Sequence, residues 1–335
     1  MFSFTWESTM SILELRQDVQ SHLSAFLWSQ WAQMGVLATT NREDRWAADP
    51  EALLLLTFEV GREEPRLLNE VLDWLVRNER LVSIQRLRNL ARDDEDRALI
   101  EAVVGWLGER RRRARLEARP MADGSADAEP FFRNSQLPTD EPDPAFLAQG
   151  LLKPRFEPAG KSQTPHVLLP INFGFRLRLL MGIGARAEAM RVLLTIDAPR
   201  TNVQVVAAST AYAKRNIQEA ISSLSAAGAL DAFEVGNEQR FSAPRDRWSR
   251  FLTLDDLPHH EDWIQVFAAY RKTLRWLVDP AHGALSTYML SSEARTLVEE
   301  VTPDLQFAGV AIEGHRDDSA YLERFIRQLL ERGPI

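Results

Sequence analysis

The feature that most constrains the fold of this chain is a proline-rich, acidic stretch near its middle. Residues 119–165 contain eight of the 17 prolines in the sequence. Proline removes a backbone donor and breaks helices, so we expect a linker or an extended strap here. Large apolar residues within it can pin parts of the strap onto a neighbouring surface: Phe131, Phe132, Phe146, Leu151 and Leu152.

Residues 1–118, before this stretch, are predicted to form a helical domain. Apolar residues recur at helical spacing in two runs, Leu67–Val76 and Leu99–Leu107. Asp49-Pro50-Glu51 has the pattern of a helix start, and Ser83 is a second predicted cap. Four tryptophans are expected to fill the core of this domain: Trp28, Trp31, Trp74 and Trp106.

The helical period stops at Leu107, and a cationic run follows at Arg110–Arg115. One interpretation is an arm that binds nucleic acid or a protein partner. The other is a solvated final helical turn, whose cations suit the negative end of the helix dipole. The second interpretation is the commoner one for such a run.

Residues 166–250 are predicted to form a second domain. It begins with a short extended piece and a helix that carries Arg176 and Arg178. Three further helices are expected, over 186–195, 201–208 and 213–227.

The third of these helices has one apolar face, made by Ile217, Ala220, Ile221 and Leu224. Its end is marked by a glycine, as in a left-handed C-cap. Two short strands should follow, over 230–235 and 239–242, with a glycine-containing turn between them.

This order of three helices and a hairpin resembles the winged helix-turn-helix superfamily, in the form found in bacterial regulators. The matching segments are AYAKRNIQEAISSLSAAGAL for the recognition helix and FEVGNEQRF for the wing. The resemblance covers residues 184–243 of the 335. Two positions depart from the pattern: Ala211, where the turn between the helices often has glycine, and Ala213, where serine or threonine usually caps the third helix.

The resemblance implies that the third helix reads bases in the major groove of double-stranded DNA. The groove admits one α-helix, and each base pair presents a distinct donor and acceptor pattern there. We expect Arg215 to contact guanine, and Asn216 or Gln218 to contact adenine.

Other polar residues of the segment are expected to position the DNA. Lys214, Arg186 and Arg200 are candidates for contacts to phosphates, which orient a complex without specifying sequence. Arg240, at the wing, is expected to enter the minor groove or touch the backbone. Tyr212, near the start of the third helix, completes the set of candidates.

Charge supports a local binding face. From Arg176 to Arg250 there are 11 basic and 7 acidic residues, a net charge of +4, in a chain whose net charge is −8. The remainder of the chain therefore carries −12. A positive face on an acidic protein suits site-directed DNA binding with limited non-specific affinity. The alternative is a winged helix that docks a protein and has a solvated polar face.

The last segment, residues 251–335, is predicted to be a helical extension with two amphipathic helices. Each has an apolar face that either packs in a core, the commoner case, or forms a dimer or partner surface. The two faces consist of Trp263, Val266, Phe267, Tyr270, Leu274 and Leu277, and of Leu322, Phe325, Ile326 and Leu329.

The sequence indicates no catalytic, metal or cofactor site. It has no cysteine, which excludes thiol catalysis, zinc–thiolate sites and iron–sulfur clusters. No histidine pair has the HExxH spacing, and there is no phosphate loop, dinucleotide fingerprint or nucleophile elbow. His259-His260 is interpreted as part of a polar helix start. We therefore expect no enzyme activity and no cofactor.

Localisation is expected to be cytoplasmic, in a protein of bacterial type. The first residues, MFSFTWESTM, lack the basic segment, apolar core and small-residue cleavage site of a signal peptide. No apolar run approaches the roughly 18–20 residues of a membrane-spanning helix, so no membrane contact is expected.

Together these patterns predict a mainly α protein: a helical N-terminal domain, a strap, a winged helix and a helical extension. The predicted function is sequence-specific binding of double-stranded DNA by a transcriptional regulator. Palindromic sites would make it a homodimer, paired through the N-terminal domain or the helices of 258–332. The alternative is a non-catalytic protein-interaction module, such as an antitoxin-like or scaffolding partner.

Overall fold

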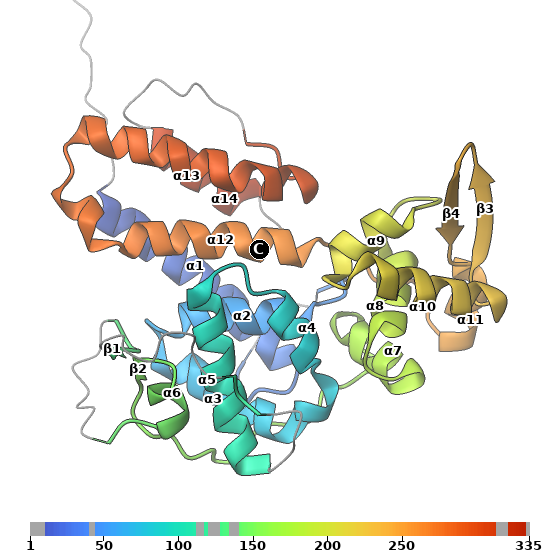
Figure 1. Cartoon of the computed structure of the whole chain (residues 1–335), viewed down its shortest axis with the longest axis horizontal. Coiled ribbons are helices and arrows are strands. Elements are labelled where there is room, and N and C mark those ends of the chain that lie inside the picture. The colour runs from blue at the N-terminus through green and yellow to red at the C-terminus, as the bar shows by residue number, and fades with distance from the viewer. Residues whose placement is uncertain are drawn as a thin grey trace, which may run out of the picture. The chain divides into compact units, whose positions relative to one another are not determined.

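The computed structural model describes residues 11–39, 44–111, 117–119, 128–133, 141–312 and 321–332. The protein is mainly helical, which confirms the predicted class at that level (Figure 1). The chain divides into two compact units. One takes the described residues of Met1–Phe26 and Gln265–Ile335, and the other consists of Leu27–Ile264. Both boundaries between the units fall inside a helix.

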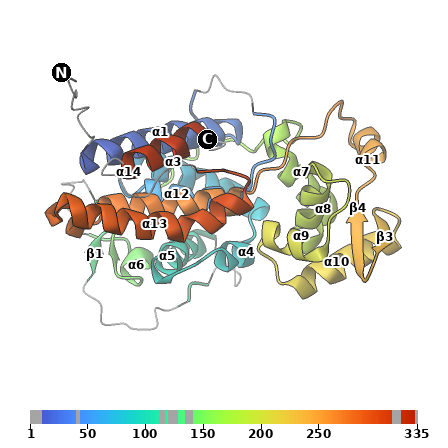
Figure 2. The ribbon, with the colours of Figure 1, turned by 90° about the horizontal axis from the view of Figure 1, so that it is seen from above.

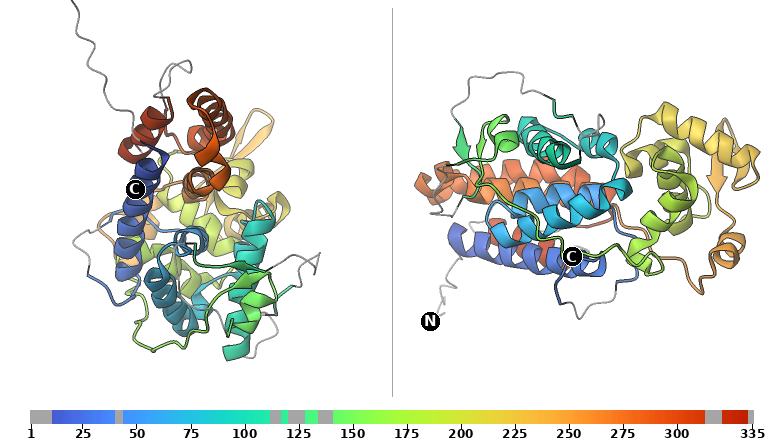
Figure 3. Two further views of the ribbon diagram at one scale, coloured as in Figure 1. Left: turned by 90° about the vertical axis from the view of Figure 1, so that its left-hand side faces the viewer. Right: turned by 90° about the horizontal axis from the view of Figure 1, so that it is seen from below.

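The unit that holds the C-terminal residues is a group of helices (Figure 3). Its elements are the first part of α1 (Ile12–Gln33), most of α12 (Trp263–Val278), the short η4 (Pro280–Ala284), α13 (Thr287–Phe307) and α14 (Tyr321–Arg332). The Tyr270 hydroxyl donates to the Leu329 carbonyl at 2.8 Å, which joins α12 to α14. Both predicted apolar faces are buried. Core packing thus accounts for them.

The unit Leu27–Ile264 begins with the N-terminal helices. They are α2 (Pro50–Val60), α3 (Pro65–Asn78), η1 (Glu79–Leu81), α4 (Ile84–Asn89) and α5 (Asp94–Arg111). Both predicted caps are present. The Asp49 carboxylate accepts from the Ala52 amide at 3.1 Å, and the Ser83 hydroxyl accepts from the Arg86 amide at 3.2 Å.

The described parts of the proline-rich stretch lie as a strap on these helices. The strap contains α6 (Pro144–Leu147) and two short parallel strands, β1 (Glu129–Pro130) and β2 (Leu151–Leu152). The predicted anchors are covered: Phe131, Phe132, Phe146 and Leu151 are buried, and Leu152 is half-buried. An ion pair of 2.8 Å between Arg133 and the buried Glu59 fixes the strap to α2.

The second half of this unit contains the three helices and the hairpin that were predicted over residues 186–242, together with the helices that flank them. Its elements are η3 (Pro170–Asn172), α7 (Phe173–Met181), α8 (Ala185–Thr195), α9 (Val203–Thr210), α10 (Lys214–Ala226), β3 (Asp231–Val235), β4 (Glu238–Ser242) and α11 (Arg245–Leu252). Helices α2–α5 gather on one side of the unit and α7–α11 on the other, with the hairpin and α11 farthest from α2–α5 (Figures 1 and 2).

Helices α8–α10 and the hairpin share one core. The predicted apolar face of α10 is buried, from Ile217 through Leu224. The hairpin is antiparallel, and its Phe241 is buried in the same core. Phe241 also exchanges two backbone hydrogen bonds with Thr201, just before α9. The hairpin is therefore fixed to the helices at its base.

Six charged side chains are buried together where the two halves of the unit meet. Each is at most 2% exposed, and they comprise Asp49, Glu51, Arg86, Arg178, Glu188 and Arg191. They come from α2 and its cap, α4, α7 and α8. Three guanidinium groups balance three carboxylates, so this buried ion cluster is neutral.

Short contacts link the buried ion cluster across the chain. Glu51 lies 2.7 Å from an Arg86 nitrogen and 2.6 Å from an Arg178 nitrogen. Glu188 lies 2.6 Å from Arg178 and 2.9 Å from Arg191. The Arg178 guanidinium also donates to the Leu81 carbonyl at 2.6 Å. These contacts hold α7 and α8 against α2 and α4.

Neighbouring arginines lower the pKa of two carboxylates of the cluster, Glu188 and Asp49, despite their burial. Burial by itself would raise the pKa of Glu188, but Arg178, Arg86 and Arg191 outweigh it and hold this pKa well below its usual range. The pKa of Asp49 is likewise lowered, because Arg86 and Arg191 outweigh its loss of solvent. Removing one cation would therefore leave an uncompensated charge in the core.

We predict that Arg178→Met lowers the free energy of unfolding by about 3–5 kcal/mol, the usual cost of breaking a buried ion pair from one side. The variant leaves three buried carboxylates facing two guanidinium groups. Urea denaturation measures the change. The control is Arg97→Met, which breaks an exposed pair with Asp94 and should cost less than about 1 kcal/mol. Equal, small losses in both variants would contradict the account.

Candidate nucleic-acid interface

The turn between α9 and α10 is held from outside by α4. The Arg86 Nε donates to the Thr210 carbonyl at 2.7 Å, and the Asn89 side-chain amide donates to the Ala211 carbonyl at 3.1 Å. Ala211 has φ of 55°, in the left-handed region that glycine favours. Ala211 is one of the two positions that depart from the winged-helix pattern, and its backbone has a conformation that glycine adopts freely.

Tyr212 packs toward α4. It is half-buried, and its hydroxyl lies 3.4 Å from the Ser83 hydroxyl. Burial raises the pKa of the phenol above its ordinary value. The structure thus places Tyr212 as an anchor of the turn, with its polar atom beside Ser83 rather than on the exposed face of α10.

The first turn of α10 presents a polar surface. Lys214, Arg215 and Asn216 are exposed there, and Gln218 is half-buried. The Arg215 side chain is 87% exposed and lies 2.9 Å from Glu219 of the next turn. Ala213 provides no side-chain cap for α10, as its residue type implies. Four of the predicted candidates therefore lie together on this helix.

Arg186 joins this group from a different helix. It is exposed at the start of α8. It lines a cavity of about 380 Å³ with Tyr212, Asn216, Glu219 and the loop before α8. The fold thus brings five candidates to the start of α10, with Tyr212 packed behind them.

The remaining two candidates meet at the β3–β4 hairpin. The Arg200 guanidinium lies over the ring of Phe233, 3.9 Å from its centre. Phe233 in β3 is the register partner of Arg240 in β4, so their side chains share one face of the hairpin. Arg240 is 43% exposed, with a nitrogen 3.7 Å from Glu238. Arg200, from the loop before α9, and Arg240, from β4, therefore form a second cationic group at one face of the hairpin.

The buried ion cluster reduces the charge that this region can present. Arg178, Arg191 and Glu188 are withdrawn into it, which lowers the net charge available from Arg176–Arg250 from +4 to +3. The spacing of these residues gave no sign of this, since their partners lie far away in the sequence.

The arginine run at the end of α5 lies only partly within the described residues, since Arg112–Arg115 fall outside them. The Arg110 guanidinium stacks on Trp106, 4.1 Å from the ring centre, and donates to the Phe156 carbonyl at 3.0 Å. Arg111 donates to the Val76 carbonyl. These two arginines pack against the protein.

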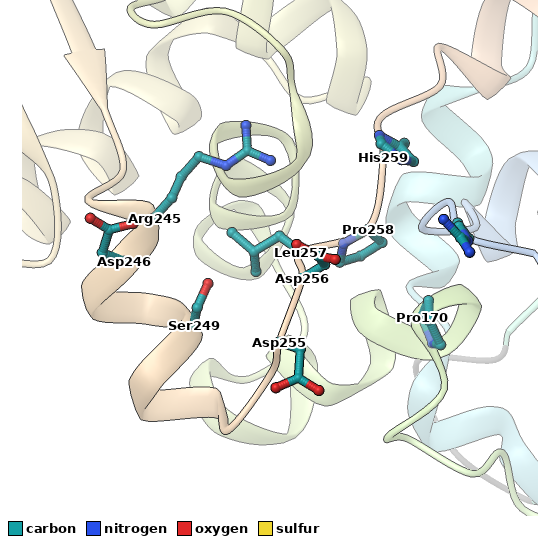
Figure 4. A pocket seen from close by; sticks show the side chains of 10 residues that line it. Pro170, Arg245, Asp246, Ser249, Asp255, Asp256, Leu257, Pro258 and His259 are labelled. Atoms are coloured by element: carbon teal, nitrogen blue, oxygen red, sulfur yellow. The ribbon is translucent and has the colours of Figure 1, made fainter.

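A larger cavity, of about 720 Å³, lies between α11, η3 and the segment 255–259 (Figure 4). Arg245 and His259 line it, but so do the acidic residues Asp246, Asp255 and Asp256. Carboxylates at these positions repel a phosphate backbone. The lining of this cavity is therefore unsuited to a phosphate backbone.

Acidic and histidine side chains were the candidates for a metal site among the described residues. No group of three or more His, Asp or Glu side chains there could hold a metal ion. Ser209 donates to Asp262 at 2.8 Å, and His260 lies 3.1 Å from the same carboxylate oxygen. Ser209 and His260 thus share Asp262 as their partner.

The helices of the described chain include none with the length and apolar character to span a membrane. Comparison with protein-family models, curated proteins and solved structures finds no match to this chain.

We predict that Ala211→Gly raises the free energy of unfolding by about 0.5–1 kcal/mol, because a left-handed conformation strains alanine and glycine adopts it freely. The gain is partly offset by the greater freedom of glycine in the unfolded chain. The control, Ala98→Gly in α5, should lower the same quantity by about 0.5–1 kcal/mol. Urea denaturation distinguishes the two, and a loss of stability in both variants would show that Ala211 is unstrained.

Proposed function

We propose that α8–α10 and the β3–β4 hairpin form a winged helix-turn-helix that binds double-stranded DNA, in a transcriptional regulator. The observation that carries the proposal is the arrangement of α10. Its apolar face is buried, while Lys214, Arg215 and Asn216 are exposed on its first turn. The N-terminal residues of a recognition helix are those that contact base edges.

The dimensions and energies agree with reading by α10. A helix with side chains is about 10–12 Å across, and the major groove is about 12 Å wide. Arg215 must leave Glu219 to contact a base, but an exposed pair of this kind contributes less than about 1 kcal/mol. A bidentate contact to guanine contributes about 1–3 kcal/mol, so the exchange is favourable.

The wing supplies the second part of the proposed interface. Arg200 and Arg240 lie on one face of the hairpin through Phe233. Two cations at the face of a projecting hairpin, one from β4 and one from the loop before α9, suit contacts to phosphates or to a narrow minor groove. Their charges position the duplex, and the specificity is assigned to α10.

We further propose that the regulator is a cytoplasmic homodimer, since two-fold symmetry matches palindromic sites.

The second candidate function is a protein-interaction module of the antitoxin-like or scaffolding kind. It is favoured by three exposed apolar side chains at the end of α7 and in the loop after it, Leu179, Leu180 and Ile183. Exposed apolar groups close together are typical of protein contacts.

The decisive experiment is binding of the purified protein to random duplex DNA and to duplexes selected from a random pool, across a salt series. Arg215→Ala should weaken binding to the selected site by about 1–3 kcal/mol and relax its specificity. Lys214→Ala should weaken binding to all duplexes and reduce the salt slope by about one.

The matched control is Arg97→Ala, which also removes an exposed, ion-paired arginine from a helix but lies in α5. It should leave both duplex affinities within about twofold, since it removes no proposed phosphate contact. If the wild-type protein binds no duplex even at low salt, the DNA-binding function is wrong, and a protein partner becomes the assignment.

We predict that Glu219→Gln strengthens DNA binding by about fivefold at low salt, because one charge pair at 4 Å in water is worth about 1 kcal/mol. The variant releases Arg215 from its ion pair and removes a carboxylate that repels phosphate. The effect should shrink as salt is raised. A weaker complex would mean that Glu219 positions Arg215 or contacts a base itself.

A further inference from the structure

The exposed face of α4 borders the start of α10. Asn89, which donates to the Ala211 carbonyl, is itself exposed, and so is Gln85 one turn earlier. The Gln85 side chain donates to the Asn89 side-chain oxygen at 2.9 Å. Ala211 is three residues before Lys214, so their Cα atoms are at most about 11 Å apart. The two amides therefore extend the polar surface of α10 onto a second helix.

Helix α4 cannot swing away from this position without breaking buried bonds. Arg86, on its inner face, is fully buried with Asp49 and Glu51 and also donates to the Thr210 carbonyl. The Ser83 amide, at the cap of α4, donates to Glu51 at 2.7 Å. Any duplex that admits the first turn of α10 into its major groove must therefore accommodate α4 beside it.

We propose that α4 is a second DNA-contacting element, with Gln85 and Asn89 meeting the sugar–phosphate backbone beside the groove that α10 enters. This inference rests on the proposed DNA-binding function. The walls of the major groove are phosphate backbones, and side-chain amides are among the common donors to phosphate oxygens.

The contact is made by neutral groups. The cation on this helix nearest Asn89, Arg88, is already held by Glu101 through two hydrogen bonds of 2.7 and 2.8 Å. A neutral donor releases no counterions when it meets a phosphate, so its loss lowers affinity without changing the salt slope. This separates the contribution of α4 from that of Lys214.

The test uses Gln85, because it is exposed and its replacement by Lys or Glu hardly changes helix propensity. Binding to a selected duplex is measured across a salt series. Gln85→Lys should tighten binding about fivefold at low salt and steepen the salt slope by about one, since it adds one phosphate contact. Gln85→Glu should weaken binding about fivefold, and Gln85→Ala should weaken it with an unchanged slope.

The matched controls are Gln306→Lys and Gln306→Glu, which make the same charge changes at an exposed glutamine of α13. They should stay within about twofold of the wild-type protein. The inference is overturned if the Gln85 variants behave like the Gln306 variants while Lys214→Ala still weakens binding. In that case the DNA-binding function is retained and only the contact by α4 is rejected. It is also overturned if Gln85→Ala tightens binding, because α4 would then obstruct the duplex. If the wild-type protein binds no duplex, the proposed function fails, and this inference with it.

Discussion

The buried ion cluster is the interaction on which the arrangement of the larger unit depends. It joins residues that are far apart in sequence, such as Glu51 and Arg178, which are separated by 127 positions. Taking charges out of water is costly, so such a cluster adds little net stability compared with well-packed apolar residues. What it adds is direction, because each guanidinium donates its hydrogen bonds in its own plane. We infer that the cluster selects one way of packing α7 and α8 against α2 and α4.

The proposed reading helix takes its position from the same cluster. Arg86 bonds on one side to Asp49 and Glu51, and on the other to the carbonyl of Thr210, just before α10. Asn89 and Ser83 add contacts to the next two residues. The left-handed Ala211 is strained, and strain of this kind persists only where the surroundings hold it. Contacts from α4 and its cap thus fix the turn between α9 and α10, and this turn sets the orientation of α10.

Local patterns predicted the local parts of this structure. Helical spacing located the buried face of α10, and residue type located the caps at Asp49 and Ser83. The same patterns gave no sign of the cluster, because pairing between Asp49 and Arg86 depends on packing rather than on spacing. Tyr212 illustrates the limit most clearly, because its place before a helix gave no sign that its hydroxyl lies beside Ser83, the cap of α4, 129 positions away in the sequence.

The most direct test of the role of the buried ion cluster is amide hydrogen exchange of the native protein. The free energies of opening are compared between α2, in the N-terminal helices, and α8, in the second half of the unit. If the cluster joins both halves into one cooperative body, the most protected amides of the two helices will open with the same free energy, to within about 1 kcal/mol. Exchange of α8–α10 through a separate opening of much lower free energy, with α2 still protected, would contradict it. Helices α8–α10 would then be an independent module, and α4 would not set the orientation of α10.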